Sequence, residues 1–188
     1  MSAVRPRLNR DVVVDMATQI ADSEGIDAVT LQRIANDAGV TQPALYKHVS
    51  GIEELWKLMS LRGRAILAER LRTSVTGLTG DDAVRSAAFA WRGMAREHPG
   101  LYAATDRVPL FGDAEIETAL WSVIDALSSS LDGYGLDDET RAHCARSLRS
   151  SLHGFVTLER DGGHPEPFAI DESLDRLVAL FCAGLRSL

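Results

Sequence analysis

Cysteine is nearly missing from this chain of 188 residues, which holds only Cys144 and Cys182. The two lie far apart in segments with helical periodicity, which favours reduced thiols packed as small hydrophobic side chains over a disulfide framework. Long apolar runs are missing too, since none approaches the ~20 residues that span a bilayer. The start, MSAVRPRLNRD, also lacks the apolar segment of a secretory signal. These absences predict a soluble protein of the cytoplasm.

Positive charge is scarce in the chain as a whole, because 20 Lys and Arg residues face 27 Asp and Glu residues and leave a net charge of −7. The deficit belongs to one part of the chain. Residues 1–72 hold ten basic and nine acidic side chains, a net of +1, whereas residues 73–188 hold ten and eighteen, a net of −8. The first part can therefore meet phosphate groups although the whole chain is acidic.

Alternating strand patterns are missing as well, and apolar residues recur instead at the three- and four-residue spacing of amphipathic helices. This pattern predicts an all-α fold of about nine helices. The small, polar, Gly-containing stretch TSVTGLTGDD at 73–82 is the one shift in composition that looks like a boundary. We therefore expect a small helical head at 1–50, a connecting helix at 51–72 and a larger helical body at 73–188.

The head begins and ends with helix-capping signals. Asn9 can cap a first helix, which Gly25 ends. Ser50 and Glu53 form an S-x-x-E capping box before a long fourth helix. These signals place two further helices in the short interval between the first and the fourth.

Those two helices are short and closely joined. Thr30 opens one that stops at Gly39 after about two turns, and Thr41 starts the next, with Pro43 in its first turn, where its missing N–H costs nothing. Helices of this length are unstable alone, so they must hold each other. Small Ala35 and Gly39 permit the close crossing that a helix-turn-helix needs.

The second of these helices suits the major groove of B-DNA, provided that its first side chains point outward. Gln42 can pair with adenine N6 and N7, and Lys47 with guanine O6 and N7 or with a phosphate. Thr30, Thr41 and Tyr46 offer hydroxyl groups to phosphate oxygens. The alternative is an ordinary helical corner with a solvated polar face.

The pattern T-x-x-x-I-A-x-x-A-G-V-T-x-x-x-L-Y-x-H, from Thr30 to His48, resembles the N-terminal signature of the TetR family of bacterial transcriptional regulators. The resemblance covers about residues 9–56. It implies that the head is a DNA-binding domain, that a homodimer reads a palindromic operator on double-stranded DNA, and that a divergent body binds a small-molecule inducer. The residues predicted to contact DNA are Thr30, Thr41, Gln42, Pro43, Tyr46, Lys47 and His48, with Arg5, Arg7 and Arg10.

Ile52 departs from this family, whose members usually have a phosphate-binding Lys near the start of the fourth helix. Lys57 lies more than one turn further on and is a poor substitute. The basic arm of Arg5, Arg7 and Arg10 can compensate by reaching the DNA backbone or the minor groove. We therefore expect operator binding that is weaker or more sensitive to salt than in relatives that carry the Lys.

Large aromatic side chains gather in the body, where together they can wall a pocket, although each alone is better explained as part of the core. The predicted ligand-binding residues are Trp91, Tyr102, Phe111, Trp121, Leu152, His153 and Phe155. No histidine or cysteine spacing fits a metal site, and no serine lies in a nucleophile elbow. The sequence therefore predicts neither an enzyme nor a cofactor.

Two stripes near the end of the chain suit dimerisation, because small residues permit close helix approach and leucines supply apolar area. The predicted dimerisation residues are Ser147, Ser151, Gly154, Leu174, Val178, Phe181 and Leu185. Two helices from each chain, paired across a two-fold axis, would make a four-helix bundle. The alternative is that both stripes pack inside one subunit.

The combined features predict a repressor that binds its operator without ligand. An inducer releases it by shifting the fourth helix and so changing the spacing of the two heads. One alternative is an activator or a corepressor-dependent regulator of the same fold. The other, which only Ile52 favours, is an all-α carrier or enzyme that has lost operator binding.

Overall fold

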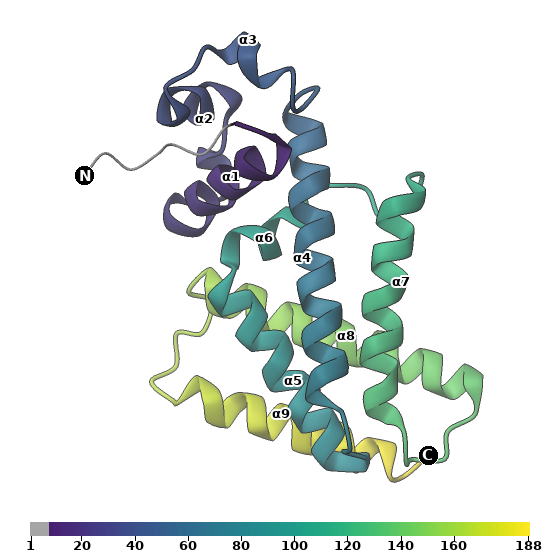
Figure 1. The fold of residues 1–188 in the computed structure, drawn as a ribbon. Helices are drawn as coiled ribbons and strands as arrows, with labels where there is room; N and C mark the ends of the chain where they lie inside the picture. Colours follow the sequence, from purple (N-terminus) through teal and green to yellow (C-terminus); the bar gives the residue numbers. More distant parts are fainter. Residues whose placement is uncertain (1–7) are drawn as a thin grey trace. The chain divides into compact units, whose positions relative to one another are not determined.

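The computed structural model describes residues 8–188, and these form nine α-helices and two short 3₁₀ helices without a strand (Figure 1). The α-helices are α1 (Arg10–Glu24), α2 (Leu31–Ala38), α3 (Gln42–Leu45), α4 (Ile52–Ser74), α5 (Gly80–Glu97), α6 (Pro99–Ala104), α7 (Ala114–Ser128), α8 (Asp138–Arg160) and α9 (Ile170–Leu185). The 3₁₀ helices are η1 (Ile26–Ala28) and η2 (Ser129–Leu131). The predicted all-α fold of about nine helices is confirmed. No described helix is both long and apolar enough to cross a bilayer.

The chain divides into two compact units, and the division does not follow the order of the sequence. The first unit joins the described residues up to Gly63 with His98–Glu117, and the second joins Arg64–Glu97 with Thr118–Leu188. Helices α4 and α7 each give residues to both units. The domain boundaries proposed from the sequence, at 50 and 72, stay predictions.

In the first unit, α6 packs closely on α1. The Asn9 side chain accepts a hydrogen bond from the Val12 N–H at 2.9 Å and caps α1, as predicted. Near the other end of α1, the Gly100 N–H donates to Asp22 Oδ1 at 2.6 Å. A Cβ atom on Gly100 would lie 2.4 Å from Ala21 Cβ, so only glycine fits between the two helices. The segment that contains α6 is thereby fixed to the first helix of the chain.

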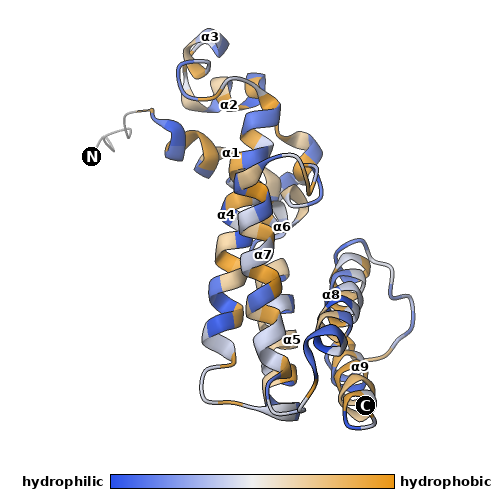
Figure 2. Cartoon of the chain, turned by 90° about the vertical axis from the view of Figure 1, so that its right-hand side faces the viewer, coloured by the Kyte–Doolittle hydropathy of each residue, from blue (hydrophilic) through white to orange (hydrophobic). Residues whose placement is uncertain are grey.

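In the second unit, α5 packs against α8 and α9 (Figure 2), and one residue from each of the three helices joins a small ionic cluster. The Arg92 guanidinium is 5% exposed and donates two hydrogen bonds of 2.7 Å to Glu159 and one of 2.6 Å to Asp171.

Both cysteines are free thiols, and Cys182 is buried, as the sequence predicts. Burial raises the pKa of each thiol.

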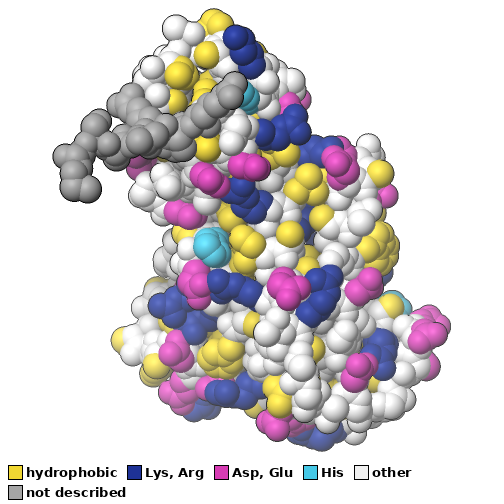
Figure 3. All heavy atoms as spheres, viewed as in Figure 1, with side chains coloured by type: hydrophobic (Ala, Val, Ile, Leu, Met, Phe, Trp, Pro, Cys, Tyr) yellow, Lys and Arg dark blue, Asp and Glu magenta, His cyan; other side chains and the backbone are white. Residues whose placement is uncertain are grey.

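On the face drawn in Figure 3, basic and acidic side chains lie next to one another rather than in separate patches.

Candidate nucleic-acid interface

The first member of the short helix pair, α2, begins and ends at the residues that the sequence predicts. Thr30 Oγ1 accepts from the Arg33 N–H at 3.1 Å and caps the start of the helix. Gly39 ends it in the left-handed region, at φ 67°, and the Val40 N–H returns to the Ala35 carbonyl at 3.0 Å. This is the turn that a helix-turn-helix needs, and glycine adopts it without strain.

The second member, α3, is shorter than expected, with one turn from Gln42 to Leu45 followed by a hydrogen-bonded turn through His48. The Ile34, Ala35 and Leu45 side chains are completely buried and hold α2 and α3 together. Thr41 stands at the N-cap position, but its hydroxyl makes no capping bond. The start of α3 is therefore open to an outside partner.

Most of the side chains predicted to contact DNA around α3 are exposed. Thr41, Pro43, Tyr46 and Lys47 are exposed, with Tyr46 at 52%, and Gln42 is half-buried. Among the residues that the structure describes, none makes a side-chain hydrogen bond or ion pair with Gln42, Tyr46 or Lys47. Exposed polar side chains held on a rigid turn and left without partners are what recognition of an outside surface requires.

The start of α4 is fixed by Glu54, which corrects the predicted capping box of Ser50 with Glu53. The helix begins at Ile52, so Glu54 is its third residue, and this carboxylate accepts from the Ser50 N–H at 2.5 Å. That hydrogen bond holds the pKa of Glu54 below its usual value. Arg10 adds a 2.8 Å ion pair to Glu54 and a hydrogen bond of 3.2 Å to the His48 carbonyl. The turn after α3 is thereby tied to both α1 and α4.

The basic residues that could strengthen DNA binding differ in the contacts that they make. Lys57 is not free, because its ammonium group contacts Asp113 at 2.7 Å and Glu115 at 2.5 Å, and these partners raise its pKa. Ile52 is half-buried at the start of α4. Arg5 and Arg7 lie outside the described residues. The DNA contact predicted for Arg10, now seen paired with Glu54, stays a prediction.

The predicted ligand-binding residues are divided between the two units. Tyr102 and Phe111 belong to the first unit, and the other five belong to the second. Trp91, Tyr102 and Leu152 are buried, whereas Phe111 and Trp121 are 69% and 55% exposed. His153 and Phe155 are half-buried on α8. Their role in ligand binding stays a prediction.

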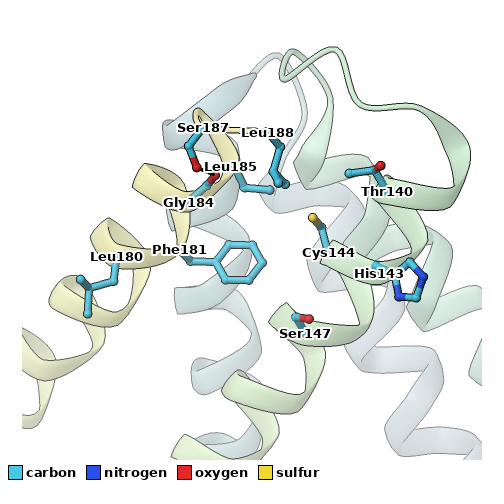
Figure 4. A pocket seen from close by; sticks show the side chains of 10 residues that line it. All are labelled: Thr140, His143, Cys144, Ser147, Leu180, Phe181, Gly184, Leu185, Ser187 and Leu188. Carbon is cyan, nitrogen blue, oxygen red and sulfur yellow. Dashed lines mark hydrogen bonds between the residues drawn. The ribbon is translucent and has the colours of Figure 1, made fainter.

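Three of the predicted dimerisation residues, Ser147, Phe181 and Leu185, line an open groove between α8 and α9 with a volume of about 550 Å³. Phe181 from α9 and Cys144 from α8 point toward one another across it (Figure 4). Leu174, Val178 and Leu185 are buried within the chain, so they already pack inside the subunit. Ser147 is exposed, and Ser151, Gly154 and Phe181 are half-buried.

Two further apolar residues of this groove, Leu180 and Leu188, are each 74% exposed, and sequence reasoning missed them. The sequence could have indicated Leu180, because it lies next to Phe181 on the same apolar helix. Leu188 lies beyond α9, where helical periodicity carries no information. The groove therefore extends past the end of α9, beyond the predicted stripe.

The geometry of the first unit defines the chain as a protein of the helix-turn-helix class. Two family models match the chain. They are "Bacterial regulatory proteins, tetR family" over residues 13–59 and "Tetracyclin repressor-like, C-terminal domain" over residues 84–181. Among curated relatives, the uncharacterized HTH-type transcriptional regulator Rv0681 of Mycobacterium tuberculosis is 37% identical over 163 residues, 86% of this chain and 75% of the relative. YobS of Bacillus subtilis, also an uncharacterized HTH-type transcriptional regulator, is 32% identical over 180 residues, 95% of this chain and 93% of the relative.

The fold is also that of BioQ, solved with its double-stranded DNA operator, with a TM-score of 0.69, 22% identity and coverage of 97% of this chain and 100% of that one. The chain belongs to the TetR family. It is a helix-turn-helix transcriptional regulator, and its relatives are named as regulators rather than as enzymes.

Proposed function

We propose that the chain is a dimeric repressor that occupies a palindromic operator and leaves it when a small molecule binds. The observation that carries the proposal is the set of exposed polar side chains around α3, which have no partner among the described residues. Regulators of this family bind DNA operators and small ligands. A repressor of this kind acts on DNA, so we assign it to the cytoplasm.

In the proposed complex, α3 and the turn after it enter the major groove. Gln42 pairs with adenine and Lys47 with guanine or a phosphate, since an amide and an ammonium group suit those base edges. The hydroxyl groups of Thr30, Thr41 and Tyr46 bind phosphate oxygens and fix the position of the head. Sequence preference would then depend on Gln42 and Lys47.

The groove between α8 and α9 supports the dimer. Leu180 and Leu188 are largely exposed and line the groove together with Phe181, so the face offers apolar area that a second copy would cover. Two helices from each copy would then form a four-helix bundle. A two-fold axis is also what a palindromic operator matches, because each half-site needs one head.

Release by an inducer requires that the ligand bind the DNA-free state more tightly than the DNA-bound state. Helix α4 supports such coupling, because one continuous helix begins next to the turn after α3 and ends in the second unit. Activation, or repression that needs a corepressor, uses the same geometry with the opposite ligand preference.

Fluorescence anisotropy with a palindrome from the DNA upstream of the chain's own gene tests the proposal. We expect saturable, sequence-specific binding at low salt, and a Gln42→Ala variant that no longer distinguishes the palindrome from a base-substituted copy. Gln19→Ala, an exposed glutamine on α1, is the matched control and should keep the preference. Absence of specific binding at low salt would favour a carrier or enzyme over a regulator.

A further inference from the structure

A second cavity lies entirely within the first unit and has a volume of about 390 Å³, within the range of small-molecule sites. It opens between the first turns of α4 and the loop that joins α6 to α7. Val108, Pro109 and Ile116 supply an apolar lining, and Ile116 is only 1% exposed. A ligand in this cavity would therefore touch the helix that begins next to the turn after α3.

Two aromatic rings line the cavity. Trp56 comes from α4, and Phe111, which is 69% exposed, comes from the loop. The Arg107 guanidinium already lies 5.9 Å from the centre of the Trp56 ring, within the range of a cation–π contact. The Trp56 ring thus has a cation beside it in the protein itself.

The charges around the cavity favour a positive ligand. Both lining cations are neutralised, Lys57 by Asp113 and Glu115, and Arg107 by an ion pair with Asp27. Glu53 is exposed, and no residue of the described chain forms an ion pair with it. The lining holds the cations Lys57 and Arg107 and the carboxylates of Glu53 and Asp113. Since both cations and Asp113 are paired, Glu53 is the one lining charge without an ion pair in the described chain.

We propose that this cavity binds planar aromatic cations. The ring system stacks between Trp56 and Phe111, and the positive charge faces Glu53. This site goes beyond the proposed function, because it lies in the unit that carries α2 and α3. Of the seven ligand-binding residues predicted from the sequence, it uses only Phe111.

Calorimetric titration of the whole chain with 1-methylquinolinium chloride, without DNA, tests the proposal independently of operator binding. Quinoline is the matched neutral ligand, because it has the same fused rings and is uncharged at pH 7.5. We expect the cation to bind about tenfold more tightly than quinoline, which corresponds to one cation–π contact with its neighbouring charge. Equal affinities, or no binding of the cation, would overturn the proposal.

Two variants locate the site without disturbing the fold, since both residues are exposed. Phe111→Ala and Glu53→Gln should each weaken binding of the cation several-fold. The controls are Phe168→Ala, where the ring is 73% exposed in the second unit, and Glu139→Gln, an exposed acid in the first turn of α8. An affinity equal to that of the unchanged chain in both test variants would place the ligand elsewhere and refute the site.

Discussion

Lys47 in the first unit and Arg92 in the second show two opposite uses of a basic side chain. Lys47 is exposed beside α3 and has no ion pair within the described part of the chain, whereas Arg92 is 5% exposed and makes three hydrogen bonds to two carboxylates. A charge that stabilises the fold is satisfied from within, because an unpaired buried charge is costly. A charge meant for an outside partner stays in water until that partner arrives.

The largest expected effect comes from breaking the internal cluster. Arg92→Met leaves Glu159, whose side chain is 15% exposed, without its partner. We expect the free energy of unfolding to fall by about 3 kcal/mol, measured by urea denaturation. The double variant Arg92→Met with Glu159→Leu should recover much of that loss, because both charges are then gone. A single variant as stable as the unchanged chain would show that the cluster does not stabilise the second unit.

Gly100 tests how closely α6 and α1 approach within the first unit. Gly100→Ala adds a methyl group where a Cβ would lie 2.4 Å from Ala21 Cβ and 2.8 Å from the Ala21 carbonyl carbon. We expect a loss of about 1–3 kcal/mol in the free energy of unfolding, measured by thermal denaturation. Gly93→Ala on α5 is the control, because the atoms nearest to an added Cβ there would be 3.8 Å away and alanine favours helix. Equal effects of the two substitutions would contradict the close approach.

Lys47→Ala tests the proposed role of the exposed basic side chain in DNA binding. It should weaken operator binding by about 1 kcal/mol and, if the contact is to a phosphate, reduce the slope of log affinity against log salt by about one unit. Folding stability should not change, since the side chain has no partner to lose. Arg146→Ala, an exposed basic residue on α8, is the control for charge alone and should leave anisotropy titrations unaffected.

Acid titration gives the smallest expected effect. The pKa of Glu54 is lowered by the Ser50 N–H, so its charged form stabilises the native state above the ordinary carboxyl pKa and this contribution is lost as the pH falls through the lowered value. Asp22 acts in the opposite sense, because burial raises its pKa. Its protonated form stabilises the native state at low pH, and this stabilisation is lost as the pH rises through the raised pKa. Glu54→Gln should therefore flatten the loss of thermal stability on acidification.

Short-range signals made much of the first unit readable from the sequence. Thr30 and Gly39 act within one helix length, so their caps could be predicted from residue type alone. Glu54 replaced Glu53 because α4 begins one residue later than the capping box assumed. Apolar residues at helical spacing also form the core face of α5 in the second unit, where the buried residues include Val84, Ala87, Ala88, Trp91, Met94 and Ala95.

Contacts between distant residues could not be read in this way. The pairing of Lys57 with Asp113 joins residues 56 positions apart, and no local pattern marks either partner. Gly100 follows a proline and looks like a simple helix start, yet it fits against α1. An exposed apolar face such as that of Leu180 is equally compatible with solvent or with a second chain, because periodicity describes one helix and not what covers it.

The contact of Gly100 with α1 also determines how motion can pass through the first unit. Long side chains absorb small displacements by changing rotamer, but Gly100 lies directly against Ala21, whose methyl group has no rotamer to change. A shift of the segment 98–117 must therefore move the α1 backbone or break the 2.6 Å bond to Asp22. The close contact at Gly100 therefore transmits a displacement of α6 to α1 instead of absorbing it.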